Sequence, residues 1–134
     1  PCSKKDRADF VLSDKQYELA KRRLKLASAL QYTLPGVPCV FYGDEAGKQG
    51  FEDPLNRDTY PWGREDADLI AHYTKLGEIR KQYPQFLQGE THFVSDSDKL
   101  VFERVCIDGV LRVETQGLWL SISVNGKVVM TINK

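Results

Sequence analysis

The chain has 134 residues, of which 41% are hydrophobic and 28% charged, a composition typical of folded globular domains and not of disordered chains. Nineteen Lys and Arg balance nineteen Asp and Glu, so the net charge is zero. No basic excess therefore indicates binding to nucleic acid or to an anionic membrane, and no apolar stretch approaches the roughly 18 residues of a membrane-spanning helix. The first residue is Pro1 and the only methionine is Met130, so we expect the natural chain to begin further upstream.

Charge is unevenly distributed along the chain. Residues 1–34 carry eight basic and four acidic side chains, whereas residues 35–68 carry three basic and eight acidic ones, so functional groups are best sought in the second segment.

The three cysteines, Cys2, Cys39 and Cys106, are widely separated. This spacing supports neither a zinc site nor a disulfide framework, and we expect buried free thiols.

The first predicted element is a helix over residues 14–34. Ser13 followed by Gln16 is a capping-box pattern, and apolar residues then recur at intervals of three and four. The apolar run that follows, VPCVFY at 37–42, lacks alternation. It predicts a strand buried on both faces, as in a parallel sheet covered by helices.

Residues 43–63 are predicted to form a long loop, and loops of this length inside compact domains are usually functional. A second helix is predicted over residues 64–83. Acidic residues in its first turn favour the positive end of the helix dipole, and Pro84 ends it.

After residue 88 the hydrophobic period changes from about 3.6 residues to 2. Strands are predicted at 100–106, 110–115, 118–124 and 127–132, separated by the turn dipeptides Asp108-Gly109, Gln116-Gly117 and Asn125-Gly126. The chain therefore divides into residues 1–88, which are helical with one strand, and an antiparallel β domain at 89–134. We expect further strands of that domain to be missing.

Three sequence segments carry a family resemblance. Residues 34–47 read LPGVPCVFYGDEAG, residues 53–62 read DPLNRDTYPW, and the preceding helix contains RLKLASALQYTLPG at 23–36. The chain resembles the alpha-amylase superfamily of glycoside hydrolases, most closely its neopullulanase, cyclomaltodextrinase and maltogenic amylase branch. The resemblance implies an α+β fragment: the last α-β-α segment of a (β/α)8 TIM barrel followed by an antiparallel β-sandwich-type C-terminal domain.

The resemblance also implies a function. Family members cleave α-glucosidic bonds with retention, using an Asp nucleophile, a Glu acid/base and a second Asp, and the motifs that carry these three residues are absent here. We therefore expect the C-terminal part of an enzyme acting on maltooligosaccharides, cyclodextrins or pullulan, inactive by itself and without a cofactor. Its implied partners are an α-glucan oligosaccharide and the missing N-terminal part of the enzyme, in a cytoplasmic homo-oligomer.

Asp53 and Arg57 are the predicted substrate-binding residues. In the resembled branch this pair contacts a sugar on the non-reducing side of the cleavage point. The chemistry suits that role, because a carboxylate accepts from adjacent hydroxyls and a guanidinium donates in a planar fork. The alternative is an ion pair that only braces the loop.

Other residues of the loop are candidates for weaker roles. Asp44 and Glu45 directly follow the predicted strand, but adjacent carboxylates diverge and cannot flank a bond, so support of the active-site rim is expected. Asp44, Glu45, Asp53 and Asp58 could together bind calcium through oxygen. The aromatic residues Phe51, Tyr60 and Trp62 either stack on sugar rings, with Trp62 at the rim, or form the loop's own small core.

A different class of function stays open, namely a stand-alone carbohydrate-binding or interaction module, which the β strands and the aromatic loop suggest. Outside a barrel, residues 37–42 would lack strand neighbours on both sides. Such an edge promotes pairing with other chains, so we expect the isolated chain to dimerise or to exchange elements with another copy.

Overall fold

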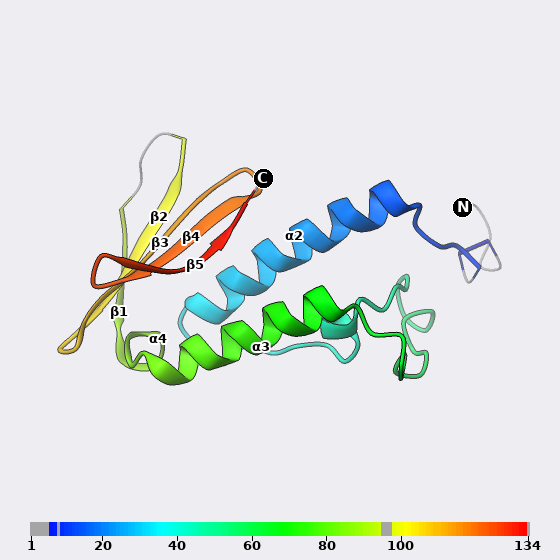
Figure 1. Cartoon of the computed structure of the whole chain (residues 1–134), viewed down its shortest axis with the longest axis horizontal. Helices are drawn as coiled ribbons and strands as arrows, with labels where there is room; N and C mark the ends of the chain where they lie inside the picture. The colour runs from blue at the N-terminus through cyan, green and yellow to red at the C-terminus, as the bar shows by residue number, and fades with distance from the viewer. Residues whose placement is uncertain (1–5, 8, 95–97, 134) are drawn as a thin grey trace.

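The computed structural model describes residues 6, 7, 9–94 and 98–133. Its elements are, in chain order, α2 (Asp14–Thr33), the short 3-10 helix η1 (Asp44–Ala46), α3 (Ala67–Gln82), α4 (Gln85–Gln88), β1 (Glu90–Phe93), β2 (Leu100–Cys106), β3 (Gly109–Gln116), β4 (Trp119–Val124) and β5 (Lys127–Ile132). Figure 1 shows α2 and α3 side by side along the long axis of the molecule. The sheet lies at one end of this pair, and the loop between η1 and α3 lies at the other.

Both long helices form as predicted, with small differences at their ends. The backbone amide of Ser13 donates to the side-chain oxygen of Gln16 at 3.0 Å, as the capping-box pattern requires. The second helix begins at Ala67 instead of residue 64, because Asp66 is its N-cap and accepts from the amides of Asp68 at 3.0 Å and Leu69 at 3.1 Å. In the parts of the chain that the structure describes, no helix has the length and apolar character needed to cross a membrane.

Residues 37–42, predicted to be a strand, form no strand in the structure. These residues have no regular secondary structure, and Val37 is 92% exposed. A strand needs a neighbour that supplies ladder hydrogen bonds, and no other described segment pairs with this one. The Cys39 thiol is exposed for the same reason, which corrects the expectation of a buried thiol; Cys106 is half-buried, and Cys2 lies outside the described residues.

The β domain is a single antiparallel sheet with the order β1-β2-β3-β4-β5. Its four long strands match the predicted ones to within two residues, whereas β1 was not expected as a separate strand. The β4–β5 turn has positive φ at both central residues, 50° at Asn125 and 79° at Gly126, as Asn-Gly hairpin turns require. Within the described residues this is one sheet, so a second sheet of a sandwich is not formed.

The core lies between one face of the sheet and the helices. It is built from Ala29, Leu76, Ile79, Phe86, Phe102, Leu111, Val113, Leu120, Ile122, Val124 and Ile132. Because successive side chains of a strand point to opposite faces, the other face of the sheet carries polar residues. On that face Arg112 donates to Glu103 at 2.6 Å and to Glu114 at 2.7 Å. The sheet therefore has one apolar face covered by helices and one polar face, as is common for antiparallel sheets.

Candidate functional site

The loop between η1 and α3 is ordered by contacts with the residues that precede α2. The amide of Leu12 donates to the side-chain oxygen of Gln49 at 2.9 Å, and Arg7 forms an ion pair with Glu52. The rings of Phe10 and Phe51 meet edge to face, with centroids 5.7 Å apart. Phe51 therefore packs against the segment before α2 and is partly buried, and with Phe10 it lines an open pocket of about 380 Å³.

Lys48 holds this loop together from within, a role that could not be predicted from the amino-acid sequence. Its ammonium group donates to the carbonyl oxygens of Asn56 at 2.9 Å and Asp58 at 2.7 Å. It also lies 4.5 Å from the centroid of the Tyr42 ring, whose hydroxyl donates to the same Asp58 carbonyl at 2.8 Å. One cation thus joins the start of the loop to its middle, through contacts that depend on the fold alone.

Asp53 and Arg57 come together as the sequence suggested. The guanidinium of Arg57 meets both carboxylate oxygens of Asp53, Nη2 to Oδ2 at 3.1 Å and Nε to Oδ1. The two side chains remain 59% and 69% exposed, so the pair lies at the surface of the loop. Such a fork can brace the loop and still offer its free lone pairs and N–H groups to sugar hydroxyls.

Asp44 and Glu45 lie in η1, which follows Gly43 in a left-handed conformation with φ 93°. The carboxylate of Glu45 accepts from the amide of Gly43 at 2.9 Å, so its role is to stabilise the turn. Burial, reinforced by the charge of Glu45, raises the pKa of Asp44. As consecutive residues of one short helical turn, the two do not form the opposed carboxyl pair that glycoside cleavage requires.

The four carboxylates suggested for calcium do not converge. Asp53 is bound to Arg57, and Asp58 accepts from the amide of Thr59 at 2.7 Å. Across residues 6, 7, 9–94 and 98–133, no group of three or more His, Cys, Asp or Glu side chains is placed to hold a metal ion.

Tyr60 and Trp62 form an aromatic pair at the end of the loop. Their ring centroids are 4.6 Å apart, and the amide of Trp62 donates to the Tyr60 carbonyl at 2.9 Å. Trp62 is 80% exposed, so its indole ring is not part of a loop core. Of the three loop aromatics, Trp62 alone presents a broad face to solvent.

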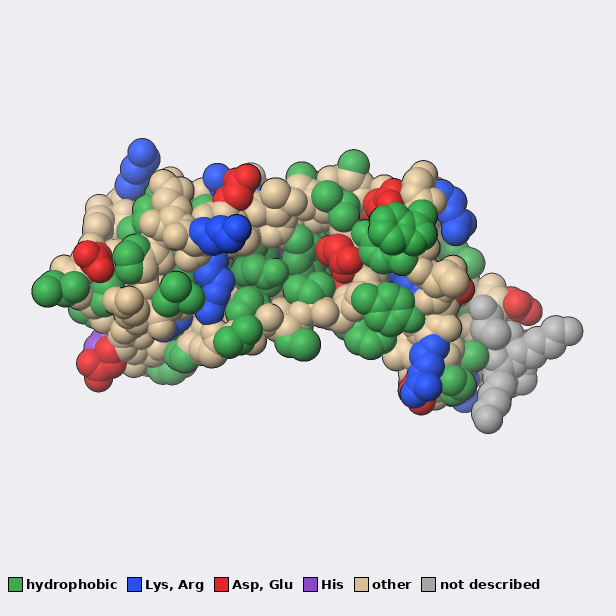
Figure 2. Space-filling view, turned by 90° about the horizontal axis from the view of Figure 1, so that it is seen from below, with side chains coloured by type: hydrophobic (Ala, Val, Ile, Leu, Met, Phe, Trp, Pro, Cys, Tyr) green, Lys and Arg blue, Asp and Glu red, His purple; other side chains and the backbone are tan. Residues whose placement is uncertain are grey.

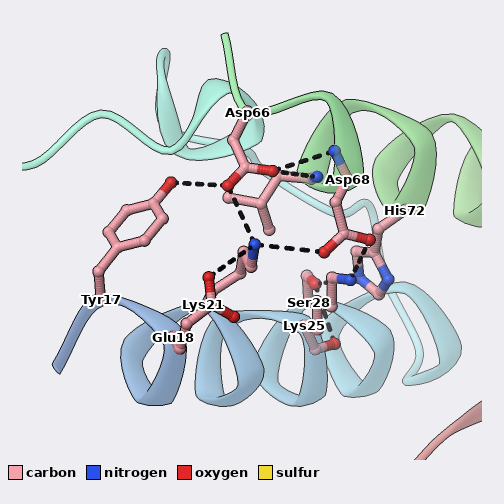
Figure 3. Close-up of polar contacts among 9 residues, drawn as sticks. Tyr17, Glu18, Lys21, Lys25, Ser28, Asp66, Asp68 and His72 are labelled. Atoms are coloured by element: carbon pink, nitrogen blue, oxygen red, sulfur yellow. Dashed lines mark hydrogen bonds and ion pairs between the residues drawn. The ribbon is translucent and has the colours of Figure 1, made fainter. Parts of the chain in front are cut away.

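A polar network joins α2 to the start of α3 (Figure 3). Asp66 lies at its centre, with Oδ2 accepting from the Tyr17 hydroxyl at 2.9 Å and from the Lys21 ammonium at 3.2 Å. Lys21 also reaches Asp68 at 3.4 Å. Burial and the hydrogen bond to Asp66 raise the pKa of Tyr17 to about 12, and although burial opposes it, the contacts with Leu69, Tyr17 and Lys21 lower the pKa of Asp66.

The network continues to a buried histidine. Lys25 pairs with Asp68 at 2.6 Å, and the neighbouring His72 ring lies 2.8 Å from the Ser28 hydroxyl through Nε2. Burial, together with the nearby charge of Lys25, lowers the pKa of His72 to about 4. The Ser28 hydroxyl also donates to the Leu24 carbonyl at 2.8 Å, and within the described residues His72 belongs to no group of metal ligands, so it is a neutral structural residue that fixes the packing of α2 on α3.

An open groove lies beside the unpaired residues 37–42. It has a volume of about 370 Å³ and is lined by Tyr32, Val40, Tyr42, Glu45 and Tyr73. Figure 2 shows hydrophobic side chains gathered in a hollow midway along the molecule, with acidic side chains beside them. The described residues thus combine a sugar-compatible polar pair, an exposed indole and an uncovered apolar surface, but no catalytic acid/base pair.

Similarity to known proteins shows to which family the chain belongs. No protein-family model matches the chain. An amylopullulanase from Thermoanaerobacter thermohydrosulfuricus is 44% identical over 93 residues, which is 69% of this chain and 6% of that protein. A cyclomaltodextrinase from Geobacillus thermopakistaniensis is 35% identical over 81 residues, 59% of this chain and 14% of that protein.

Solved structures agree with the sequence relatives. The crystal structure of a maltogenic amylase from S. marinus superimposes with a TM-score of 0.67 and 32% identity, over 71% of this chain and 14% of that one. The chain therefore belongs to the alpha-amylase family of glycoside hydrolases, and the resemblance in its sequence is confirmed. Its relatives are amylopullulanases, cyclomaltodextrinases and a maltogenic amylase, and it spans only 6% to 14% of the lengths of the three proteins compared.

Proposed function

We propose that this chain is the C-terminal part of a retaining α-glucan hydrolase that acts on maltooligosaccharides, cyclodextrins or pullulan. The observation that carries the proposal is the joint likeness in sequence and fold to an amylopullulanase, a cyclomaltodextrinase and a maltogenic amylase. The names of these relatives define the substrate classes. Because the described residues contain no opposed carboxyl pair, the catalytic groups belong to another part of the parent enzyme.

In the parent enzyme, α2, residues 37–42 and α3 form the last α-β-α segment of a (β/α)8 barrel, and the sheet begins a C-terminal domain of the sandwich type. Three features support this assignment. Residues 37–42 are apolar and unpaired among the described residues, the groove beside them is uncovered, and α2 packs directly on α3. Neighbouring barrel strands would supply the missing ladder hydrogen bonds and cover the exposed apolar side chains.

Within that enzyme, Asp53 and Arg57 bind a glucose unit of the substrate, and Asp44, Glu45 and Trp62 support the rim of the site. The exposed fork of Asp53 and Arg57 supports the first role, since its unused lone pairs and N–H groups match a pair of sugar hydroxyls. The test is a parent enzyme carrying Asp53→Asn or Arg57→Gln. We expect KM for maltooligosaccharides to rise about tenfold, a loss near 1.4 kcal/mol of binding; an unchanged KM would leave the pair with the loop-bracing role only.

The isolated 134 residues provide a second test. Because they lack the catalytic groups, the purified chain should release no reducing sugar from any α-glucan. Turnover that Asp44→Asn or Glu45→Gln abolished would place catalysis in this chain and would refute the proposal.

A stand-alone carbohydrate-binding module is the second candidate, favoured by the 80% exposed indole of Trp62. The chain contains two tryptophans, so Trp119→Phe leaves Trp62 as the single tryptophan reporter. Saturable quenching of its fluorescence by maltoheptaose would favour this candidate; a flat titration at millimolar sugar would count against it.

The cytoplasmic location and the homo-oligomeric state remain predictions. We infer self-association of the isolated chain from the unpaired residues 37–42, since Val37, Phe41 and Tyr42 are exposed and such segments promote edge pairing. Light scattering on the purified chain tests this, and a cooperative monomer would show it wrong.

A further inference from the structure

Lys48 is hydrogen-bonded to the main chain on both sides of Arg57. Its ammonium group donates to the carbonyl oxygen of Asn56, the residue before Arg57, at 2.9 Å, and to that of Asp58, the residue after it, at 2.7 Å. The Tyr42 hydroxyl donates to the same Asp58 carbonyl at 2.8 Å. Because each peptide unit is planar, a residue whose two neighbours are both held has few backbone conformations left. These bonds therefore fix the point from which the Arg57 side chain extends.

The turn at residues 53–58 has few other anchors. The main-chain hydrogen bonds of the turn itself are local, as between the Arg57 amide and the Pro54 carbonyl at 3.1 Å. Within the described part of the chain, every hydrogen bond that reaches this turn from beyond its directly adjacent residues is donated by Lys48 or Tyr42. The position of the turn relative to the start of the loop thus depends on these two side chains.

Lys48 is itself fixed at its main chain and along its stem. Its amide donates to the Gly43 carbonyl at 2.9 Å. The stem packs so closely on Gly43 that a Cβ added to this glycine would lie 2.9 Å from the Cβ and Cδ atoms of Lys48. Gly43 is buried and has a φ of 93°, a left-handed conformation that favours glycine. Lys48 therefore connects a well-defined turn before η1 to the main chain around Arg57.

All three donors of the Lys48 ammonium are used within the described residues. An ammonium group carries three N–H bonds; two are directed to carbonyl oxygens, and the Tyr42 hydroxyl oxygen lies 3.3 Å from Nζ for the third. By contrast, the Arg57 and Asp53 side chains are 69% and 59% exposed. Lys48 can thus act on a bound sugar only through the residues that it holds.

We propose that Lys48 is a positioning residue for glucan binding, which orients the Arg57 guanidinium toward the sugar by holding the carbonyl groups before and after it. This inference rests on the proposed binding of a glucose unit by Asp53 and Arg57. An arginine that is oriented in advance loses less conformational freedom when the sugar binds, so the pair binds more tightly. The described residues contain no opposed carboxyl pair for bond cleavage, so the effect of Lys48 belongs in KM and not in kcat.

The first measurement uses the 134-residue chain. Nitrogen-15 relaxation of the Arg57 Nε–H group, assigned by its loss in Arg57→Gln, reports how well the guanidinium is ordered. We expect the order parameter to fall in Lys48→Met. It should keep the parental value in Lys48→Arg, which retains donors for both carbonyl groups, and in Lys15→Met, an exposed position of α2. An unchanged order parameter in Lys48→Met would overturn the proposal, whatever Arg57 binds.

The second measurement is a double-mutant cycle in the parent enzyme with maltooligosaccharides as substrates. We expect Lys48→Met to raise KM about fivefold while kcat stays within about twofold, and Lys48→Arg to keep the parental KM. In an enzyme that already carries Arg57→Gln, Lys48→Met should raise KM by less than about twofold, because the side chain that it positions is gone. Lys15→Met should leave both constants unchanged.

The outcomes separate this inference from the proposed function. If Arg57→Gln raises KM and Lys48→Met does not, Lys48 only stabilises the loop, and this inference alone is wrong. If Arg57→Gln leaves KM unchanged, the proposed sugar contact is wrong and the positioning role is wrong with it. If Lys48→Met raises KM equally with and without Arg57→Gln, Lys48 acts independently of Arg57, which also overturns the inference.

Discussion

Arg104 of β2 donates from Nη1 to the main-chain carbonyl of Phe86 in α4 at 2.6 Å, in the buried interior of the molecule. The same guanidinium donates to the Gly89 carbonyl at 3.0 Å and to the Thr33 carbonyl, at the end of α2, at 3.3 Å. Only 3% of Arg104 is exposed, and its hydrogen-bond partners among the described residues are all main-chain oxygens. One side chain thus satisfies the carbonyl groups where two helices and the sheet meet.

Replacing Arg104 by methionine should therefore be costly. The change leaves several buried carbonyl groups without a donor, and we expect the free energy of unfolding to fall by about 2–4 kcal/mol. Urea denaturation followed by circular dichroism measures this loss. Arg112→Met on the polar face of the sheet is the matched control, because its ion pairs keep partial contact with solvent and should be worth about 1 kcal/mol; equal losses in the two variants would contradict the assignment of Arg104.

His72 should make the chain sensitive to acid. Its pKa is about 4 in the folded protein against 6.5 in the unfolded chain, so below pH 6.5 the unfolded state binds the extra proton and stability falls as pH falls, until about pH 4. A shift of this size corresponds to at most about 3 kcal/mol. We expect His72→Gln to flatten the dependence of the unfolding free energy on pH between 7 and 4. The same change at the exposed His92 should leave this dependence as steep as in the parent chain.

The strands and long helices were predictable because their signals are local. Dipeptides such as Asn125-Gly126 define hairpins by their own backbone preferences, and Ser13 with Gln16 defines a helix start within one turn. The Asp53 and Arg57 pair was equally accessible, since the two residues are four apart and end in complementary groups. In each case the partners lie within a few residues of each other.

The strand predicted at 37–42 is not formed in the structure, for the opposite reason. An apolar run of this kind is stable as a strand only beside other strands, and the described residues supply none. Lys48 and Arg104 were also out of reach, because their partners are main-chain oxygens that only the folded chain brings together. A basic side chain in a sequence does not reveal which carbonyl groups it will satisfy.

Asp66 is predicted to control both the start of α3 and the ionisation of Tyr17. Asp66→Ala removes the N-cap and the acceptor of the Tyr17 hydroxyl, so we expect a loss of about 1–2 kcal/mol in unfolding free energy. The pKa of Tyr17, raised to about 12, should fall toward its ordinary value of 10. NMR titration of the tyrosine rings, assigned with Tyr17→Phe, measures the shift. The control variant Asp68→Ala keeps the N-cap, and it should leave the pKa of Tyr17 unchanged. If Asp68→Ala lowered the pKa of Tyr17 as much as Asp66→Ala does, Asp66 would not be the residue that controls it.

Lys48 should hold the loop between η1 and α3 closed. Replacement by methionine keeps the aliphatic stem but removes the donors to Asn56 and Asp58, which lie 2.9 Å and 2.7 Å from Nζ, so the loop should open more often. We expect trypsin to cleave after Arg57 several times faster in Lys48→Met than in the parent chain, while the far-ultraviolet circular dichroism stays the same. Lys15→Met, which also removes one lysine from an exposed position, is the control and should be cleaved at Arg57 at the parental rate. If Lys48→Met were cleaved no faster than this control, the main-chain contacts of the loop would be sufficient to hold it without the ammonium group.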